Sequence, residues 1–286
     1  NEVTIEGDKV TKRCIDPRYE DVHSKEKLWY NAVSDRLENV PKIHSYDPLT
    51  MERIGGEHLW NLKENKEQLI NNFCDALDSL HSIAEVDANT DDMIDVYLKK
   101  TKSRVEEVRS LIRDIDEPMV KINSRMCINP LCDEEYFEEH IKKISNIDKF
   151  NIIHGDNTFS NTIADENSKI WFIDPRGVFG STPIYGDRRY DYAKLYYSAY
   201  GNYDSINSKD YRIKLDRRNV DLEIKSNGYE EFADLIIKRS GVPKAEIQLI
   251  HACIWFALTG YVKEDYDAVL FAFYKGCQLW TEAVSD

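Results

Sequence analysis

Three polar residues have the types and the spacing that phosphoryl transfer requires. Asn161 follows Asp156 by five positions, and Asp174 ends an apolar run thirteen residues after Asn161. This chemistry needs one carboxylate to position the attacking hydroxyl, and further oxygen ligands to hold Mg²⁺ against the nucleotide phosphates. The interval from Asn161 to Asp174 suits two short strands and a turn, which would bring both side chains together. We therefore predict Asp156 as the catalytic residue and Asn161 and Asp174 as metal ligands.

Three neighbouring residues are predicted to support this group. His154 is expected to be a buried ring that hydrogen-bonds the loop backbone. Asp191, near the start of a helix, is expected to anchor the loop through backbone N–H groups; the alternative is a plain helix-terminal charge, worth under about 1 kcal/mol. For Arg176 two interpretations stay open. Its donor-rich fork suits a phosphate or an anionic substrate, whereas a salt-bridged or solvated arginine is equally compatible with the sequence.

A lysine and a glutamate near the start of the chain are candidates for holding the nucleotide phosphates. Lys12 ends a β-prone run, and Glu26 lies fourteen residues later on a predicted helix. An ion pair between them would keep the lysine extended toward the α- and β-phosphates of ATP. Glu20 is a rival partner for Lys12.

The run at residues 49–54 is predicted to contact the adenine ring. Its backbone groups would face the adenine edge, and Met51 would shape the pocket. The binding residues assigned here are Met51, Glu52 and Ile54.

The loop His154-Gly155-Asp156…Asn161 resembles the catalytic loop of the aminoglycoside phosphotransferase and choline kinase superfamily. Ile173-Asp174 is similar to that family's metal-binding aspartate, the counterpart of the protein-kinase D-F-G aspartate. Further stretches resemble the family's hinge strand, its L-x-x-L-H-S stretch and its G-D-P-x-x-D-L-A stretch; they are residues 49–56, 77–82 and 186–193. The resemblance implies an ATP- and Mg²⁺-dependent kinase that phosphorylates a small-molecule alcohol without a covalent enzyme intermediate.

The fold that the resemblance implies is α+β and protein-kinase-like, with two lobes and the nucleotide between them. Residues 1–54 would form a truncated β-rich N-lobe with the order β-β-α-β-β, and residues 55–286 a large helical C-lobe. Periodicity predicts a strand–turn–strand at 163–174 and a candidate mobile loop at 201–222. The helical segments expected after residue 55 are 66–83, 92–115 as one helix or two, 133–145, 190–200, 228–240 and 244–276.

Two departures from the family pattern affect the expected substrate and the expected extent of the protein. Only a hairpin carries Lys12, without an earlier strand and loop to cover the phosphates, so we expect upstream residues of a longer protein to complete the lobe. Asp174 is followed by Pro175-Arg176-Gly177 instead of a small or aromatic residue. Both features favour a sugar or sugar alcohol over an antibiotic, with an amino alcohol also open, in a module of surface-polysaccharide or head-group biosynthesis.

Composition narrows the possible partners. A formal net charge of −14 argues against a nucleic-acid surface, which needs basic residues. The sequence has no apolar run of the roughly 18 to 20 residues that a membrane span requires, and no secretory signal pattern. We expect a cytoplasmic protein whose six cysteines are free thiols, although Cys127 and Cys132 are close enough in sequence to pair if oxidised. The oligomeric state is left open.

Two other functions are compatible with this fold. A pseudokinase would bind nucleotide or a partner without turnover, but it has no need of Asp156, Asn161 and Asp174 together. A protein kinase would carry an Ala-Pro-Glu segment after Asp174, which this sequence lacks.

Overall fold

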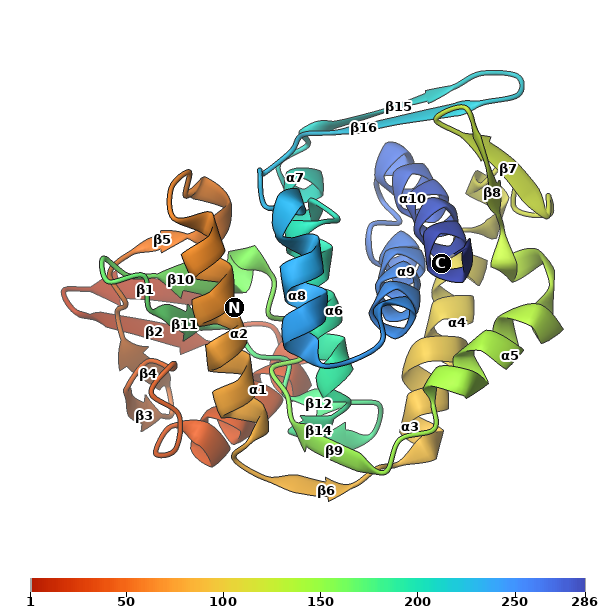
Figure 1. Ribbon diagram of the computed structural model, residues 1–286. Helices are drawn as coiled ribbons and strands as arrows, with labels where there is room; N and C mark the ends of the chain where they lie inside the picture. The colour runs from red at the N-terminus through yellow and green to blue at the C-terminus, as the bar shows by residue number, and fades with distance from the viewer. Residues whose placement is uncertain (1, 286) are drawn as a thin grey trace. The chain divides into compact units, whose positions relative to one another are not determined.

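The first part of the chain folds as a small sheet with one helix. The computed structural model describes residues 2–285 (Figure 1). The predicted order β-β-α-β-β is confirmed by β1 (Glu2–Glu6), β2 (Lys9–Arg13), α1 (Glu20–Val33), β3 (Ile43–Tyr46) and β4 (Leu49–Glu52). The sheet is antiparallel with strand order β1-β2-β4-β3, so β2 lies between two partners and places Lys12 opposite Leu49. Gly7, at φ +60°, supplies the left-handed turn of the first hairpin.

The second group of elements carries the loop with Asp156 and the run that ends at Asp174. The predicted strand–turn–strand is confirmed as a hairpin in which Thr162 pairs with Phe172. The strand order is β11-β10-β5 in one small sheet and β14-β9-β6 in another, while β12 pairs with β13. The elements are β5 (Glu57–His58), α2 (Lys66–His81), β6 (Glu85–Asp87), β9 (Lys149–Ile152), β10 (Thr162–Ala164), β11 (Ile170–Phe172), β12 (Val178–Phe179), β13 (Thr182–Pro183), β14 (Tyr185–Gly186) and α6 (Arg188–Ala199).

The remaining elements are mainly helical. Helices α9 and α10 lie side by side (Figure 1), with large aromatic side chains such as Trp255 and Trp280 fully buried. A four-stranded sheet of order β15-β16-β7-β8 belongs to the same part. The elements are α3 (Thr90–Ile94), a π-helical turn (Asp95–Lys99), α4 (Lys100–Glu106), β7 (Met119–Ile122), β8 (Arg125–Ile128), α5 (Glu134–Ile144), α7 (Tyr203–Asn207), β15 (Tyr211–Leu215), β16 (Val220–Ile224), α8 (Ala233–Ser240), α9 (Lys244–Tyr261) and α10 (Tyr266–Ser285).

Three sequence predictions in this region are wrong. The helix expected over 92–115 ends at Glu106, and a short 3₁₀ turn follows. The helix expected over 244–276 is two helices, because Asp265 accepts the N–H of Ala268 at 3.1 Å and starts a new one. The segment 201–222 is not a loop: it contains α7 and most of the β15–β16 hairpin.

Residue contacts divide the chain into two compact units. The first comprises Asn1–Ala88 and Lys149–Leu195, and the second Asn89–Asp148 and Tyr196–Asp286. Each unit therefore combines two separate stretches of sequence, and every predicted site residue belongs to the first. The lobe boundary at residues 54 and 55 falls inside the first unit and stays a prediction.

Three further observations concern the whole described chain. The α+β class is confirmed, because small sheets occupy the N-terminal part and helices dominate the C-terminal part. All six cysteines are free. Within residues 2–285, every helix is too short or too polar to cross a membrane.

Candidate active site

Lys12 is held between two carboxylates. Its side chain is nearly buried, with 8% of the residue exposed, because β2 is a central strand. The Lys12 Nζ donates to Oε1 of Glu26, on α1, at 2.7 Å, and forms a second ion pair with Oδ1 of Asp174. The structure thus pairs Lys12 with Glu26, where the sequence also allowed Glu20. Glu26 is itself 5% exposed, so this pair fixes the ammonium group beside Asp174.

Asp174 lies directly after β11 and next to the loop that contains Asn161. The N–H of Ile173 donates to the backbone oxygen of Asn161 at 3.0 Å, so the two predicted metal ligands lie on neighbouring segments, Asn161 just before β10 and Asp174 just after β11. Asp174 has φ +55°, a left-handed conformation that aspartate tolerates better than most residues. Its side chain is 49% exposed, so the carboxylate remains accessible to a ligand.

The carboxylate of Asp156 has donors on both oxygens. Lys194 Nζ lies 3.0 Å from Oδ1, and Arg176 Nε lies 3.4 Å from Oδ2. The side-chain amide of Asn161 donates to the same Oδ2 at 3.2 Å and to the backbone oxygen of Asp156 at 2.7 Å. The sequence left open whether Arg176 binds a phosphate or an anionic substrate, or is instead salt-bridged or solvated. The structure shows a salt bridge between Arg176 and Asp156.

These charges control the ionisation of Asp156. Burial is the largest single influence and raises its pKa, but the positive charges of Lys194 and Arg176 together outweigh burial and lower the pKa below the ordinary value. Asp156 is therefore ionised at neutral pH. A carboxylate of low pKa is a weak base, so this geometry suits orientation of a hydroxyl better than removal of its proton.

Asn161 and Asp174 together offer oxygen ligands of the kind that Mg²⁺ prefers. Since the Asn161 nitrogen faces Asp156, its carbonyl oxygen is the atom that can bind a cation. Within residues 2–285, no three His, Cys, Asp or Glu side chains gather as a metal site. Mg²⁺ commonly takes only one or two protein ligands and completes its shell with waters and substrate phosphates. The two residues fit that pattern.

His154 is fully buried and stabilises the backbone on both sides of the loop. Its Nε2 lies 3.0 Å from the oxygen of Ile173, and its Nδ1 accepts the N–H of Asp156 at 3.2 Å. This pattern places the ring proton on Nε2, with a neutral ring. Burial lowers the pKa of His154, although the Asp191 and Asp156 charges partly oppose this effect.

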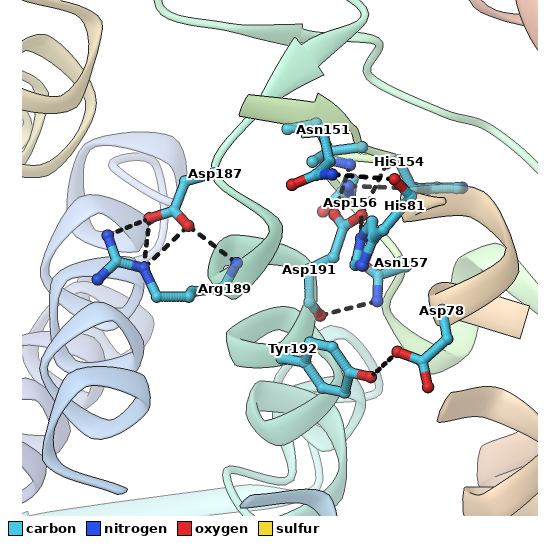
Figure 2. A network of polar contacts seen from close by, with 12 residues as sticks. Asp78, His81, Asn151, His154, Asp156, Asn157, Asp187, Arg189, Asp191 and Tyr192 are labelled. Carbon is cyan, nitrogen blue, oxygen red and sulfur yellow. Dashed lines mark hydrogen bonds and ion pairs between the residues drawn. The ribbon is translucent and has the colours of Figure 1, made fainter. Parts of the chain in front are cut away.

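Asp191 connects the loop to α6 (Figure 2). Its Oδ2 accepts the N–H of His154 at 2.9 Å, and its Oδ1 accepts the N–H of Gly155 at 2.8 Å. His81 Nε2 lies 3.0 Å from Oδ2, and the Asn157 side chain donates to the backbone oxygen of Asp191 at 2.9 Å. Asp191 is completely buried. These contacts have the geometry that the anchoring role requires. A plain helix-terminal charge would need no such contacts with the loop.

Gly155 allows this loop to approach the segment after Asp174. Its φ is +79°, and a Cβ there would lie 3.2 Å from the Cβ of Arg176. The N–H of Arg176 donates to the oxygen of His154 at 2.9 Å, so the two segments are also joined by their backbones. The positive φ therefore favours glycine at this position, and a side chain there would also make a tight contact with Arg176.

Several residues of the site were not assigned from the sequence. Lys194 lies one position beyond the 186–193 motif and carried no signal of its own. Asp187 and Arg189 lie inside that motif and form a buried, bidentate ion pair with Nη2 2.8 Å from Oδ2 (Figure 2). His81 lies in the 77–82 motif, which could have indicated its contact with Asp191.

The predicted adenine-binding run is β4 and the residues after it. Met51 is buried, with 3% exposed, between β2 and β3. The N–H of Glu52 donates to the oxygen of Lys42 at 2.8 Å, so this group is engaged in the sheet. In residues 2–285 the N–H of Ile54 has no hydrogen-bond partner, which suits a ligand contact. The adenine role of Met51, Glu52 and Ile54 stays a prediction.

Solved structures similar to this chain include members of the family that its motifs resemble. The solved structures include an aminoglycoside phosphotransferase from Streptomyces rimosus in complex with ADP and streptomycin (14% identity, TM-score 0.49, 96% of this chain and 87% of that one). They also include a choline kinase from Streptococcus pneumoniae (11%, 0.49, 97% and 84%) and a choline/ethanolamine kinase family protein from Mesorhizobium loti (14%, 0.47, 99% and 87%).

No protein-family model and no curated protein sequence matches the chain. At these identities and TM-scores, the structural similarity carries no argument about substrate or mechanism. The function has to follow from the site itself.

Proposed function

We propose that this protein transfers the γ-phosphoryl group of ATP to a hydroxyl of a small molecule. The observation that supports this most directly is the position of Lys12 between Glu26 and Asp174, with Asp174 adjacent to the loop of Asp156 and Asn161. A purely structural lysine needs no second, half-exposed carboxylate. Lys12, Asp156, Asn161 and Asp174 belong to one compact unit, which supports their assignment to a single phosphoryl-transfer site.

Each residue has a distinct role in the proposed reaction. Lys12, oriented by Glu26, binds the α- and β-phosphates. Asn161 and Asp174 would hold Mg²⁺, which when bound neutralises phosphate charge. Asp156 accepts a hydrogen bond from the acceptor hydroxyl and orients its oxygen toward the γ-phosphorus. The bond between the γ-phosphorus and the β–γ bridging oxygen breaks, the acceptor O–P bond forms, and the hydroxyl proton leaves through Asp156 to water.

The acceptor class is part of the same proposal. A sugar or sugar alcohol is favoured, with an amino alcohol as the alternative. A cytoplasmic location is consistent with the use of ATP. A place in surface-polysaccharide or head-group biosynthesis is an association with the sequence motifs, which no contact of the site supports specifically.

A transfer assay tests the proposal. The purified chain is incubated with Mg²⁺ and γ-labelled ATP, together with sugars, sugar alcohols, amino alcohols, their acidic derivatives and a generic protein. We expect label in a small alcohol, its loss on addition of EDTA, and its loss in Asp156→Asn. Nucleotide binding without any transfer would instead indicate a pseudokinase, and label in the protein substrate a protein kinase; either result contradicts the proposal.

A further inference from the structure

A cluster of polar side chains lies within the second compact unit, on helices α9 and α10 and at the end of α6. Two tyrosines, two glutamines, a lysine and a glutamate make up what we call the glutamine cluster: Tyr196, Tyr200, Gln248, Gln278, Lys275 and Glu282. The three members on α10 are spaced by three and four positions, so they share one face of that helix. A packed helix face is normally apolar, and this one is not.

Contacts connect the members of the cluster. The Tyr200 hydroxyl donates to Oε2 of Glu282 at 3.1 Å, and the Gln278 amide donates to Oε1 of the same carboxylate at 3.3 Å. The rings of Tyr196 and Tyr200 lie 4.9 Å apart. Burial raises the pKa of Tyr196, and a side-chain contact with Gln248 partly opposes this effect. The side chains from the three helices therefore meet in one place.

Three polar groups of the cluster lack a partner within residues 2–285. The side-chain oxygens of Gln248 and Gln278 are buried and accept no hydrogen bond, and Gln248 is only 6% exposed. The ammonium group of Lys275 has neither a hydrogen bond nor an ion pair, although Glu282 and Glu230 act on it electrostatically. Burial lowers the pKa of this lysine. Buried polar groups without partners destabilise a fold, so they indicate that something else completes the cluster.

The unpartnered groups define the chemistry that would complete the cluster. An amide oxygen only accepts hydrogen bonds, and a lysine ammonium only donates them. A hydroxyl does both, whereas an ammonium group on a ligand supplies only donors and an ionised carboxylate only acceptors. Several hydroxyls on one carbon skeleton would therefore satisfy the two glutamine oxygens and the lysine together.

We infer that the glutamine cluster binds the hydroxyl groups of a neutral polyol, a sugar or a sugar alcohol, with Gln248 and Gln278 accepting hydrogen bonds and Lys275 donating one. Lys275, Gln278 and Glu282 are partly exposed, so a ligand can reach the cluster from the α10 side. The residues assigned to phosphoryl transfer all belong to the first unit, and this site is additional to them. Only the further step, that the polyol is the phosphoryl acceptor, rests on the proposed function.

Titrations of the nucleotide-free chain test the inference. Glycerol, sorbitol, D-glucose and myo-inositol are the neutral polyols, and ethanolamine and hexane-1,6-diol are the comparison ligands. Hexane-1,6-diol has the six-carbon chain and terminal hydroxyls of sorbitol but lacks the four internal hydroxyls. We expect at least one polyol to bind with a millimolar or lower Kd, and about tenfold or more tightly than either comparison ligand, since about one hydrogen bond accounts for that ratio.

Variants assign the binding to the cluster. Gln248→Met and Lys275→Met should each weaken polyol binding about tenfold or more, because each removes one partner of the ligand. Lys275→Met should also leave the thermal unfolding temperature of the free chain unchanged or higher, since an apolar group replaces an unpaired ammonium. A purely structural lysine would instead lose stability when replaced. Lys143→Met, at an exposed position on α5 in the same unit, is the matched control and should change neither property.

Two results would overturn the inference. If no neutral polyol bound, or if hexane-1,6-diol bound as tightly as the best polyol, the cluster would not recognise hydroxyl groups. If Gln248→Met and Lys275→Met both left the polyol Kd unchanged, the unpartnered groups would be completed by ordered water alone. Failure of the proposed function is a separate observation, because it appears as absent binding of a non-hydrolysable ATP analogue with Mg²⁺. Polyol binding to the nucleotide-free chain does not depend on that result.

Discussion

At the scale of single residues, Asp156 is restrained on both of its oxygens. Lys194, Arg176 and Asn161 each contact the carboxylate, which fixes its rotamer as well as its charge. Such restraint suits a group whose task is to hold a hydroxyl in line with the γ-phosphorus. Pre-orientation of this kind can account for a large part of a catalysed rate.

Replacement of Asp156 by asparagine tests this role. Asp156→Asn keeps the shape of the side chain but removes the charge that orients the hydroxyl, so we expect turnover to fall by about two to four orders of magnitude. The Kd for Mg·ATP should remain nearly unchanged, because Lys12 and Asp174 are intact. The measurement is single-turnover phosphoryl transfer alongside nucleotide titration, with the exposed Asp148→Asn as control. Turnover within about threefold of the parent chain would exclude Asp156 as the catalytic residue.

The charge on Lys194 should set the acid limit of activity. Burial alone would raise the pKa of Asp156, and the Lys194 charge is the first of the influences that reverse this. Because the pKa is depressed, Asp156 stays ionised as the pH falls until its folded pKa is reached. Lys194→Met should therefore move the acid limb of the kcat/KM profile to higher pH, and Lys194→Arg should restore it. If Lys194→Met and Lys194→Arg had acid limbs at the same pH as each other, this account of the Lys194 charge would be wrong.

The sequence indicated the main residues of the candidate site because their spacing is characteristic, and their roles stay predictions. Asp156, Asn161 and Asp174 follow a pattern with a chemical reason, and the structure brings them to neighbouring segments. Lys194 gave no comparable signal. A lysine in a helix is usually a solvated surface residue, and only the packing of α6 against the loop places it beside Asp156.

At the scale of elements, the start of α6 anchors the loop that contains Asp156 through hydrogen bonds to Asp191. Asp191→Ala would leave the buried N–H groups of His154 and Gly155 without their acceptor. We expect a loss of about 3 kcal/mol in the free energy of unfolding, since the lost bonds involve a charged group. Asp91, also in the first turn of its helix but exposed, is the matched control. Asp91→Ala should lower the free energy of unfolding, measured by urea denaturation, by under about 1 kcal/mol. Equal effects of the two substitutions would support the simpler helix-charge interpretation.

The contact between β2 and α1 makes a second element-scale prediction. Glu26→Gln removes one of the two carboxylates that hold Lys12, so the ammonium is less well oriented toward the phosphates. We expect the Kd for Mg·ATP to rise about tenfold, equivalent to about 1.4 kcal/mol. Glu20→Gln, on the first turn of the same helix, should leave the Kd within about twofold. If Glu20→Gln had the larger effect, the pairing in the structure would not be the functional one.

Elements with strong local patterns were predictable, and elements stabilised by distant partners were not. The hairpin of β1 and β2 has a glycine turn between β-prone runs, and β10–β11 has two apolar strands around a polar turn. The strands β7, β8, β15 and β16 were missed. They form two local hairpins, and only the pairing of β16 with β7, which joins these hairpins into one sheet, spans nearly one hundred residues. The alternation Tyr-Arg-Ile-Lys-Leu over 211–215 was the available signal.

At the scale of the whole molecule, each compact unit is assembled from two separated stretches. The changes of unit occur at residues 88–89, 148–149 and 195–196, and the last of these lies inside α6. No Gly-, Pro- or Ser-rich linker marks these positions in the sequence. A boundary without a linker has no compositional signature. The division at residue 54 came instead from the β-β-α-β-β order and from the lobes that the family resemblance implies.

The division into units predicts where nucleotide binding stabilises the chain. Lys12, Glu26, Asn161 and Asp174 all belong to the first unit, so Mg·ATP should suppress local opening there. At about one hundred times the Kd, a ligand contributes about 2.7 kcal/mol to the stability of the state that binds it. We expect hydrogen exchange to slow in β2, α1 and residues 154–174, with a smaller change in α9 and α10. Asp174→Asn should abolish the magnesium-dependent part of this protection. Protection confined to α9 and α10 would mean that the nucleotide binds elsewhere, and the assignment of Lys12 and Asp174 would then be wrong.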